Sequence, residues 1–176
     1  APLGRLVGVA AAQVAGGVVT TEYALFTAAK LDHRFGDAAG PLNGTFVQGL
    51  LRIARDRGLY LVAGIAEQLA KDTRISNTLV AATPDGAIAA VYRKLHLYDA
   101  FSYQESEKIK PGDGGHKLVE IGVVKEGMMT SYDQRIQELP CASAIDVADL
   151  TSLGAALLKV DPHVDCCGSL TAPPAS

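Results

Sequence analysis

The chain has 176 residues, 48% of them hydrophobic and 20% charged, which is enough to form one globular domain with a sizeable core over residues 1–176. Its net charge is −3 and its Lys and Arg residues are dispersed, which excludes the basic surface typical of proteins that bind nucleic acid. No apolar run approaches the roughly eighteen residues of a membrane span. Three cysteines do not suit a disulfide framework, so we expect a cytoplasmic protein.

The first 31 residues contain two apolar segments separated by a glycine pair. Residues 4–14 alternate Leu, Val and Ala with Gly, and we interpret them as a buried strand rather than a signal peptide. Residues 18–26 are rich in β-branched and aromatic side chains, which predicts a second strand, although residues 22–31 also fit a helix.

A loop and a helix follow. Residues 36–44 contain Gly, Pro and Asn and predict a loop. Thr45 is the expected N-cap of a helix over residues 46–57, whose apolar side chains share one face, and Gly58 is expected to end that helix.

Three buried strands are predicted next, over residues 59–66, 76–83 and 87–93. The sequence Pro84-Asp85-Gly86 is typical of a tight turn, so the last two strands are expected to form a hairpin.

The last third of the chain predicts strands over residues 117–124 and 127–130 and a helix over residues 133–147 that Pro140 kinks. Residues 150–158 form a further apolar segment, and the rest is too rich in Pro, Gly and Ser to hold regular structure. Because strand and helix signals interleave along the chain, the fold class is expected to be α/β or α+β.

The residues that indicate chemistry are concentrated in the stretch VYRKLHLYDAFSYQESEKIKPGD, residues 91–113. Taken alone, Lys94 is typical of a surface lysine at the edge of a hairpin. Its neighbours, however, form the pattern Tyr-X-Lys-X-His-Leu-X-Asp, and TSYDQRIQEL follows at residues 130–139. With these motifs the sequence resembles the nitrilase superfamily of carbon-nitrogen hydrolases, in particular its amidase-like members.

The resemblance implies a four-layer α-β-β-α sandwich and the hydrolysis of a nonpeptide carbon-nitrogen bond, in a small amide or nitrile, through a covalent acyl-enzyme. It also implies no metal, no organic cofactor, and a homodimer or larger homo-oligomer. The charge and hydropathy already described argue against a nucleic-acid or membrane partner. The superfamily continues for several strands beyond the last residue here, so we expect an incomplete or imperfectly determined sequence, or a decayed paralogue.

The superfamily uses a Glu-Lys-Cys triad with a second, supporting glutamate, and the resemblance assigns a residue to each position. The lysine is Lys94, whose ammonium would stabilise the tetrahedral intermediate, and the supporting glutamate is Glu105. The cysteine position holds Ser131, and the position assigned to the general base holds Ala28. Residues expected to contribute to binding are Tyr132, Arg135 and Glu138.

These two departures leave two hypotheses for the function. A thiol is partly ionised at neutral pH, whereas a serine hydroxyl needs a neighbouring base, which Ala28 is not. In the first hypothesis the chain is a hydrolase, with Glu105 or Glu138 as a substitute base. In the second it is a noncatalytic binding protein, in which Lys94 and Glu105 hold a carboxylate or amide that is never cleaved.

Two other candidate sites are weaker. His96 is interpreted as a packing and hydrogen-bonding residue rather than a general base. A metal site near the end of the chain has poor spacing for tetrahedral ligation, because its adjacent cysteines lack a second pair. Its candidate ligands are His163, Asp165, Cys166 and Cys167.

Overall fold

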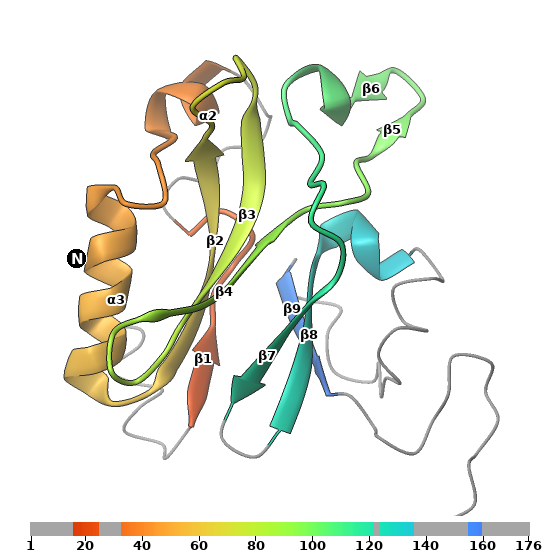
Figure 1. Cartoon of the computed structure of the whole chain (residues 1–176). Coiled ribbons are helices and arrows are strands. Elements are labelled where there is room, and N and C mark those ends of the chain that lie inside the picture. The colour runs from red at the N-terminus through yellow and green to blue at the C-terminus, as the bar shows by residue number, and fades with distance from the viewer. Residues whose placement is uncertain (1–15, 25–32, 122–123, 136–154, 160–176) are drawn as a thin grey trace, which may run out of the picture.

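The first sheet of the computed structural model has four strands in the order β1-β2-β3-β4, with β1 parallel to β2 and the other pairs antiparallel (Figure 1). The structure describes residues 16–24, 33–121, 124–135 and 155–159. The strands are β1 (Gly17–Val19), β2 (Tyr60–Gln68), β3 (Ile75–Ala82) and β4 (Ile88–Arg93). The three predicted central strands and the predicted hairpin are therefore confirmed, with shifts at their ends. The burial predicted for the third strand is wrong, because Tyr92 is the one buried residue of β4.

The predicted strand over residues 18–26 is too long. Strand β1 ends at Val19, and the following residues turn across β2. The N–H of Ala24 donates to the carbonyl of Gly64 at 2.8 Å, so the chain returns to the edge of β2 after residues 21–23 have left it. The predicted strand over residues 4–14 lies outside the described residues.

Helix α3 (Thr45–Arg57) covers one face of the first sheet and confirms the helix predicted there. Its buried side chains Val47, Leu50 and Ala54 belong to one core cluster with apolar residues of β2 and β3. Each large apolar side chain buried in this way stabilises the fold by about 1.5–3 kcal/mol. Gly58 ends the helix with a left-handed backbone (φ 62°), as predicted.

The predicted N-cap is wrong by one residue. Gly44, with an extended backbone, is the N-cap of α3, and Thr45 is the first helical residue. No side chain caps this end; instead the N–H of Gly44 donates to the carbonyl of Pro41 at 2.8 Å, which forms a turn before the helix.

The loop predicted over residues 36–44 is wrong in its first part, because α2 (His33–Ala38) extends into it. Phe35 of this helix is buried, and its ring lies edge-on to the ring of Tyr23 with centroids 4.9 Å apart. This contact between distant segments stabilises a short helix that the local sequence does not predict. Among the described residues, no helix is long and apolar enough to cross a membrane.

The second sheet contains three antiparallel strands, β7 (Lys117–Ile121), β8 (Val124–Thr130) and β9 (Ala155–Lys159). The strand predicted over residues 117–124 is too long and the one predicted over 127–130 starts too late, because Ile121 pairs with Val124 across a hairpin. Strand β9 overlaps the end of the apolar segment of residues 150–158 and ends one residue beyond it.

The helix predicted over residues 133–147 falls largely outside the described residues. Its described part, residues 133–135, lies in a short 3₁₀ helix, η2 (Ser131–Arg135). A two-stranded hairpin, β5 (Asp99–Ala100) with β6 (Tyr103–Gln104), and a second 3₁₀ helix, η1 (Glu105–Glu107), follow β4 and were not predicted.

The two sheets pack face to face, so the described residues form successive layers of helix, sheet and sheet (Figure 1). A second core cluster fills the space between the sheets. Its buried members are Val62, Leu79, Ala81 and Tyr92 from the first sheet and Val119 and Met128 from the second.

Candidate active site

The candidate site lies on the inner face of the first sheet, at the end where β4 finishes. Side chains alternate between the two faces of a strand, so Lys94, two residues after the inward-facing Tyr92, shares its face. On β3, Asn77 shares the face of Leu79 by the same alternation. The N–H of Lys94 donates to the carbonyl of Asn77 at 2.9 Å, which places these two residues side by side.

The Lys94 ammonium lies between two carboxylates. Its Nζ is 2.9 Å from each carboxylate oxygen of Glu105 and 3.7 Å from Oε1 of Glu22. The lysine side chain is only 2% exposed, and that of Glu105 only 7%. A buried charge requires such partners, so Lys94 is held for its charge and is not the surface lysine that its local sequence resembles.

Glu105 is fixed by the backbone as well as by Lys94. The N–H of Tyr98 donates to Glu105 Oε2 at 2.7 Å, and the N–H of Glu105 donates to the carbonyl of Tyr98 at 3.2 Å. This reciprocal pair closes the segment that contains the β5–β6 hairpin. The structure therefore brings together Lys94 and Glu105, as the sequence motif implied.

Glu22 reaches the site because β2 has a glycine beneath it. The turn after β1 crosses the sheet at Gly64, where a Cβ atom would lie 1.7 Å from the carbonyl oxygen of Glu22. The N–H of Thr20 donates to Val62 and that of Ala24 to Gly64, so hydrogen bonds hold the turn on both sides of Glu22. Only a residue without a side chain allows this close approach.

Replacing Gly64 by alanine is expected to displace the Glu22 turn and lower the free energy of unfolding by about 1–3 kcal/mol, since the added methyl group meets backbone that cannot move aside freely. Chemical denaturation measures this loss. The matched control is Gly49→Ala in α3, where nothing lies within 4 Å of the added methyl group. This control is expected to be more stable than the native chain, by up to about 1 kcal/mol. Equal behaviour of the two variants would contradict the close approach.

The ionisation of Glu22 is set by opposing neighbours. Burial raises the pKa of its carboxyl group above the ordinary value, the Lys94 ammonium and a hydrogen bond from Asn77 lower it, and the Glu105 carboxylate raises it; the net effect is an increase. A carboxylate with a raised pKa is a stronger base than an exposed one. Burial beside the Lys94 ammonium therefore gives Glu22 the basicity that a general base requires.

Ser131 follows directly from β8 and has a left-handed backbone, with φ 52°. This conformation is uncommon for a residue other than glycine, asparagine or aspartate, and such strain is concentrated at functional sites. The side chain is half-buried at the start of η2.

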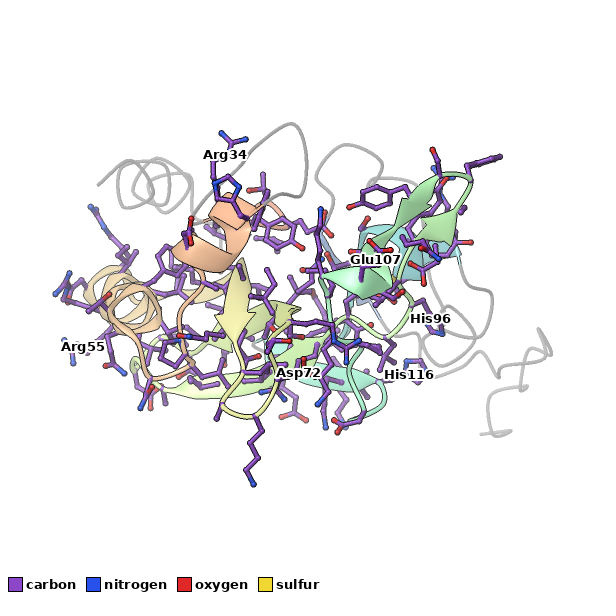
Figure 2. The ribbon with its side chains drawn as sticks, turned by 90° about the horizontal axis from the view of Figure 1, so that it is seen from above. Arg34, Arg55, Asp72, His96, Glu107 and His116 are labelled. Atoms are coloured by element: carbon purple, nitrogen blue, oxygen red, sulfur yellow. The ribbon has the colours of Figure 1, made fainter. Side chains whose placement is uncertain are left out.

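Asp133 ties this turn to the segment around Lys94. Its fully buried carboxylate accepts hydrogen bonds from the Tyr92 hydroxyl at 2.6 Å, the His96 N–H at 2.9 Å and the Thr130 N–H at 3.2 Å. The His96 ring Nδ1 lies 3.1 Å from the same group, so His96 forms the structural hydrogen bond that was expected. Seen from above (Figure 2), His96 lies across the molecule from Arg55 of α3.

The other residues expected in the site are partly described. The ring of Tyr132 lies 5.2 Å from that of Tyr98, which places the residue after Ser131 next to the Glu105 segment. Arg135 is exposed at the end of η2. The remaining expected residues lie outside the described part of the chain: Ala28, Glu138, His163, Asp165, Cys166 and Cys167.

Glu22 and Asn77 were not singled out from the sequence. For Glu22 a local signal existed, because it is a lone carboxylate three residues after a β-branched strand and precedes Tyr23. For Asn77 the signal was a polar amide inside an apolar run, a position at which a buried partner is required.

Comparison with known proteins identifies the family. The family model for carbon-nitrogen hydrolases matches residues 4–160, most of the chain. The chain belongs to the carbon-nitrogen hydrolase family. The predicted α/β fold of the nitrilase type is confirmed as well: a carbon-nitrogen hydrolase structure from Helicobacter pylori matches with a TM-score of 0.68 and 28% identity, over 78% of this chain and 47% of that one.

Two curated relatives show how far the similarity extends. The deaminated glutathione amidase of Escherichia coli O157:H7 is 38% identical over 118 residues, which are 67% of this chain and 44% of that protein. A hydrolase of Mycobacterium tuberculosis strain H37Rv is 34% identical over 160 residues, which are 90% of this chain and 53% of that protein. The carbon-nitrogen hydrolase chain described here thus spans about half the length of these relatives.

Proposed function

We propose that the chain hydrolyses a nonpeptide carbon-nitrogen bond in a small amide or nitrile through a covalent acyl-enzyme. The observation that carries this proposal is the buried Lys94 ammonium held between the carboxylates of Glu22 and Glu105. Two carboxylates and one cation at one point provide both a base and a stabiliser for an oxyanion. Membership of the carbon-nitrogen hydrolase family supports the same reaction class.

In the proposed mechanism for an amide, Glu22 accepts the proton of the Ser131 hydroxyl as its oxygen attacks the substrate carbonyl carbon. Lys94 stabilises the negative charge on the carbonyl oxygen of the tetrahedral intermediate. The carbon-nitrogen bond breaks, and the proton held by Glu22 passes to the leaving ammonia or amine. Glu22 then deprotonates a water molecule, whose oxygen attacks the carbonyl carbon of the acyl ester. The bond between that carbon and Ser131 Oγ breaks, Ser131 Oγ takes the proton from Glu22, and the acid is released.

In this proposal Glu22 takes the general-base role that the motif comparison assigned to Ala28. The support is its contact with Lys94 at 3.7 Å and its raised pKa. Tyr132 and Arg135, on the turn that begins at Ser131, are proposed to contribute to substrate binding, together with Glu138. The name of the E. coli relative, an amidase, favours an amide over a nitrile as substrate.

A noncatalytic binding protein is the second candidate, and the observation that favours it is Ser131 at the position of the cysteine nucleophile. In that case the same three charged groups would hold a carboxylate or amide without cleaving it. Ammonia release from a panel of short aliphatic amides and nitriles separates the two functions. Release that is lost in Ser131→Ala supports the hydrolase; tight binding of an amide without any release supports the binding protein.

Replacing Ser131 by cysteine is expected to raise kcat/KM for amide hydrolysis at pH 7 by at least about tenfold, equivalent to ~1.4 kcal/mol of barrier. A thiol with a pKa near 8.5 is partly ionised at neutral pH, so it depends less on the base than a hydroxyl does. Steady-state ammonia release measures the gain. The control is Ser106→Cys, on η1 near the surface, where the new thiol is outside the proposed nucleophile position. A gain in both variants, or in neither, would count against Ser131 as the attacking residue.

We also propose that the functional form is a homodimer or larger homo-oligomer in the cytoplasm. The support is the family resemblance and the absence of a disulfide framework in the sequence. Light scattering coupled to size-exclusion chromatography tests the assembly: a monomer at micromolar concentration would refute it.

A further inference from the structure

We propose that Asn77 is a positioning residue that holds the Glu22 carboxylate beside Lys94, an inference that rests on the proposed function. Asn77 is fully buried on β3 and donates a hydrogen bond from Nδ2 to Glu22 Oε1 at 2.6 Å. A hydrogen bond to an ionised carboxylate is stronger than one between neutral groups.

The same residue also contacts Lys94, through its main chain. The Asn77 carbonyl accepts the N–H of Lys94 at 2.9 Å, while its side chain binds Glu22. One residue thus determines the relative positions of the proposed base and the proposed oxyanion stabiliser. The side chain of Glu22 is 25% exposed, so it needs such a contact to keep a single orientation.

The orientation of the amide follows from chemistry. An ionised carboxylate only accepts hydrogen bonds, so the amide must present its NH₂ group to Glu22 and its oxygen elsewhere. Within the described part of the chain, no donor lies at hydrogen-bond distance from the buried Asn77 Oδ1. An unpaired buried oxygen opposes folding, so stability alone does not favour an amide here. The hydrogen bond from the NH₂ group to Glu22 provides a functional reason for an amide side chain at position 77.

Several charged or titratable groups besides Asn77 face Glu22 and also act on the pKa of its carboxyl group. Lys94 beyond β4 and the Asn77 hydrogen bond lower the pKa of Glu22, while burial and Glu105 on η1 raise it. Tyr23 beside it and Tyr103 on β6 have pKa values that burial and the nearby carboxylates raise, so both stay neutral where Glu22 titrates. Of the neighbours that lower the pKa of Glu22, Asn77 alone acts through a neutral side chain, so it can be replaced without changing the total charge.

The test is a carboxyl-carbon NMR titration of Glu22 in the full native chain and in Asn77→Leu, with the signal assigned by its loss in Glu22→Gln. We expect the titration midpoint to move to higher pH in Asn77→Leu, because the hydrogen bond that favours the ionised form is gone. In a turnover assay, kcat/KM is expected to fall about tenfold or more on the acid side of the pH profile and much less at its high-pH plateau.

The matched control is Thr78→Val. Thr78 is the next residue on β3 and is equally buried, but its hydroxyl donates to Glu67 on the opposite face of the sheet. This variant is expected to leave the Glu22 midpoint unchanged. If Asn77→Leu does not fold, Asn77→Ala, which only removes atoms, takes its place in the same titration.

An unchanged Glu22 midpoint in a folded Asn77 variant would overturn the inference, and so would an equal shift in Thr78→Val. The titration requires no turnover. If the chain releases no ammonia while the midpoint moves as expected, the proposed function fails and the Asn77–Glu22 coupling stands. If ammonia is released and the midpoint does not move, the hydrolase proposal stands and the role of Asn77 fails.

Discussion

Replacing Lys94 by methionine is expected to lower the free energy of unfolding by about 3–5 kcal/mol and to abolish ammonia release. The variant keeps most of the side-chain volume but leaves Glu105, which is 7% exposed at its side chain, without the cation that contacts both of its oxygens. Chemical denaturation at pH 7 measures the first effect and an amide hydrolysis assay the second. Because the penalty comes from buried carboxylates left without their cation, part of the lost stability should return at acidic pH, where Glu22, whose pKa is raised, takes up a proton.

The control for this prediction is Lys110→Met. The Lys110 side chain is 44% exposed and its Nζ lies 3.8 Å from Asp72, so the ion pair is screened by solvent and contributes little to the free energy of unfolding. A Lys94→Met variant that loses no more stability than this control would show that the buried charge cluster does not form in solution.

Replacing Glu22 by glutamine is expected to lower kcat/KM by about 10²–10⁴-fold, the usual contribution of a general base. The loss should occur without a loss of stability at neutral pH. Because the pKa of Glu22 is raised above its ordinary value of 4.5 in the folded chain, the stability it contributes is present below that pH and is lost as pH rises through the folded pKa. Glutamine cannot ionise and avoids this loss.

The matched control is Glu126→Gln on β8, another carboxyl group whose pKa burial raises, at a position outside the site. This variant is expected to keep the native kcat/KM. Steady-state ammonia release measures kcat/KM, and thermal unfolding at pH 7 measures the stability of each variant. A Glu22→Gln variant that is as active as Glu126→Gln would show that Glu22 is not the general base. A Glu22→Gln variant that is inactive and also unfolded would show that Glu22 is needed for folding instead.

The central strands could be predicted from the sequence because their signals are local. Leu61 to Glu67 is buried along its whole length, which matches the unbroken apolar run, and Gly86, with φ 83°, occupies the predicted turn. Helix α2 could not be predicted in this way, because the contact between Phe35 and Tyr23 that stabilises it joins two segments through the tertiary fold.

The site was predictable only in part, and for a related reason. The motif around Lys94 and Glu105 is continuous in the sequence, so the resemblance identified both residues. Glu22 is 55 residues from Asn77, and it meets Lys94 only because the turn after β1 crosses β2 at Gly64. Aligning the general-base motif through Phe26 places Ala28 at the base position. The local sequence pattern does not show that Glu22 reaches Lys94 through the tertiary fold.

The most direct test of the account is ammonia release from one short aliphatic amide by three proteins: the native chain, Ser131→Cys, and the double variant Ser131→Cys with Ala28→Glu. If Glu22 is the base, the native chain releases ammonia, Ser131→Cys releases more, and adding a glutamate at position 28 brings no further gain. If only the double variant releases ammonia, the base is missing from the native chain, and the proposal that Glu22, Lys94 and Glu105 form a working hydrolytic site is contradicted.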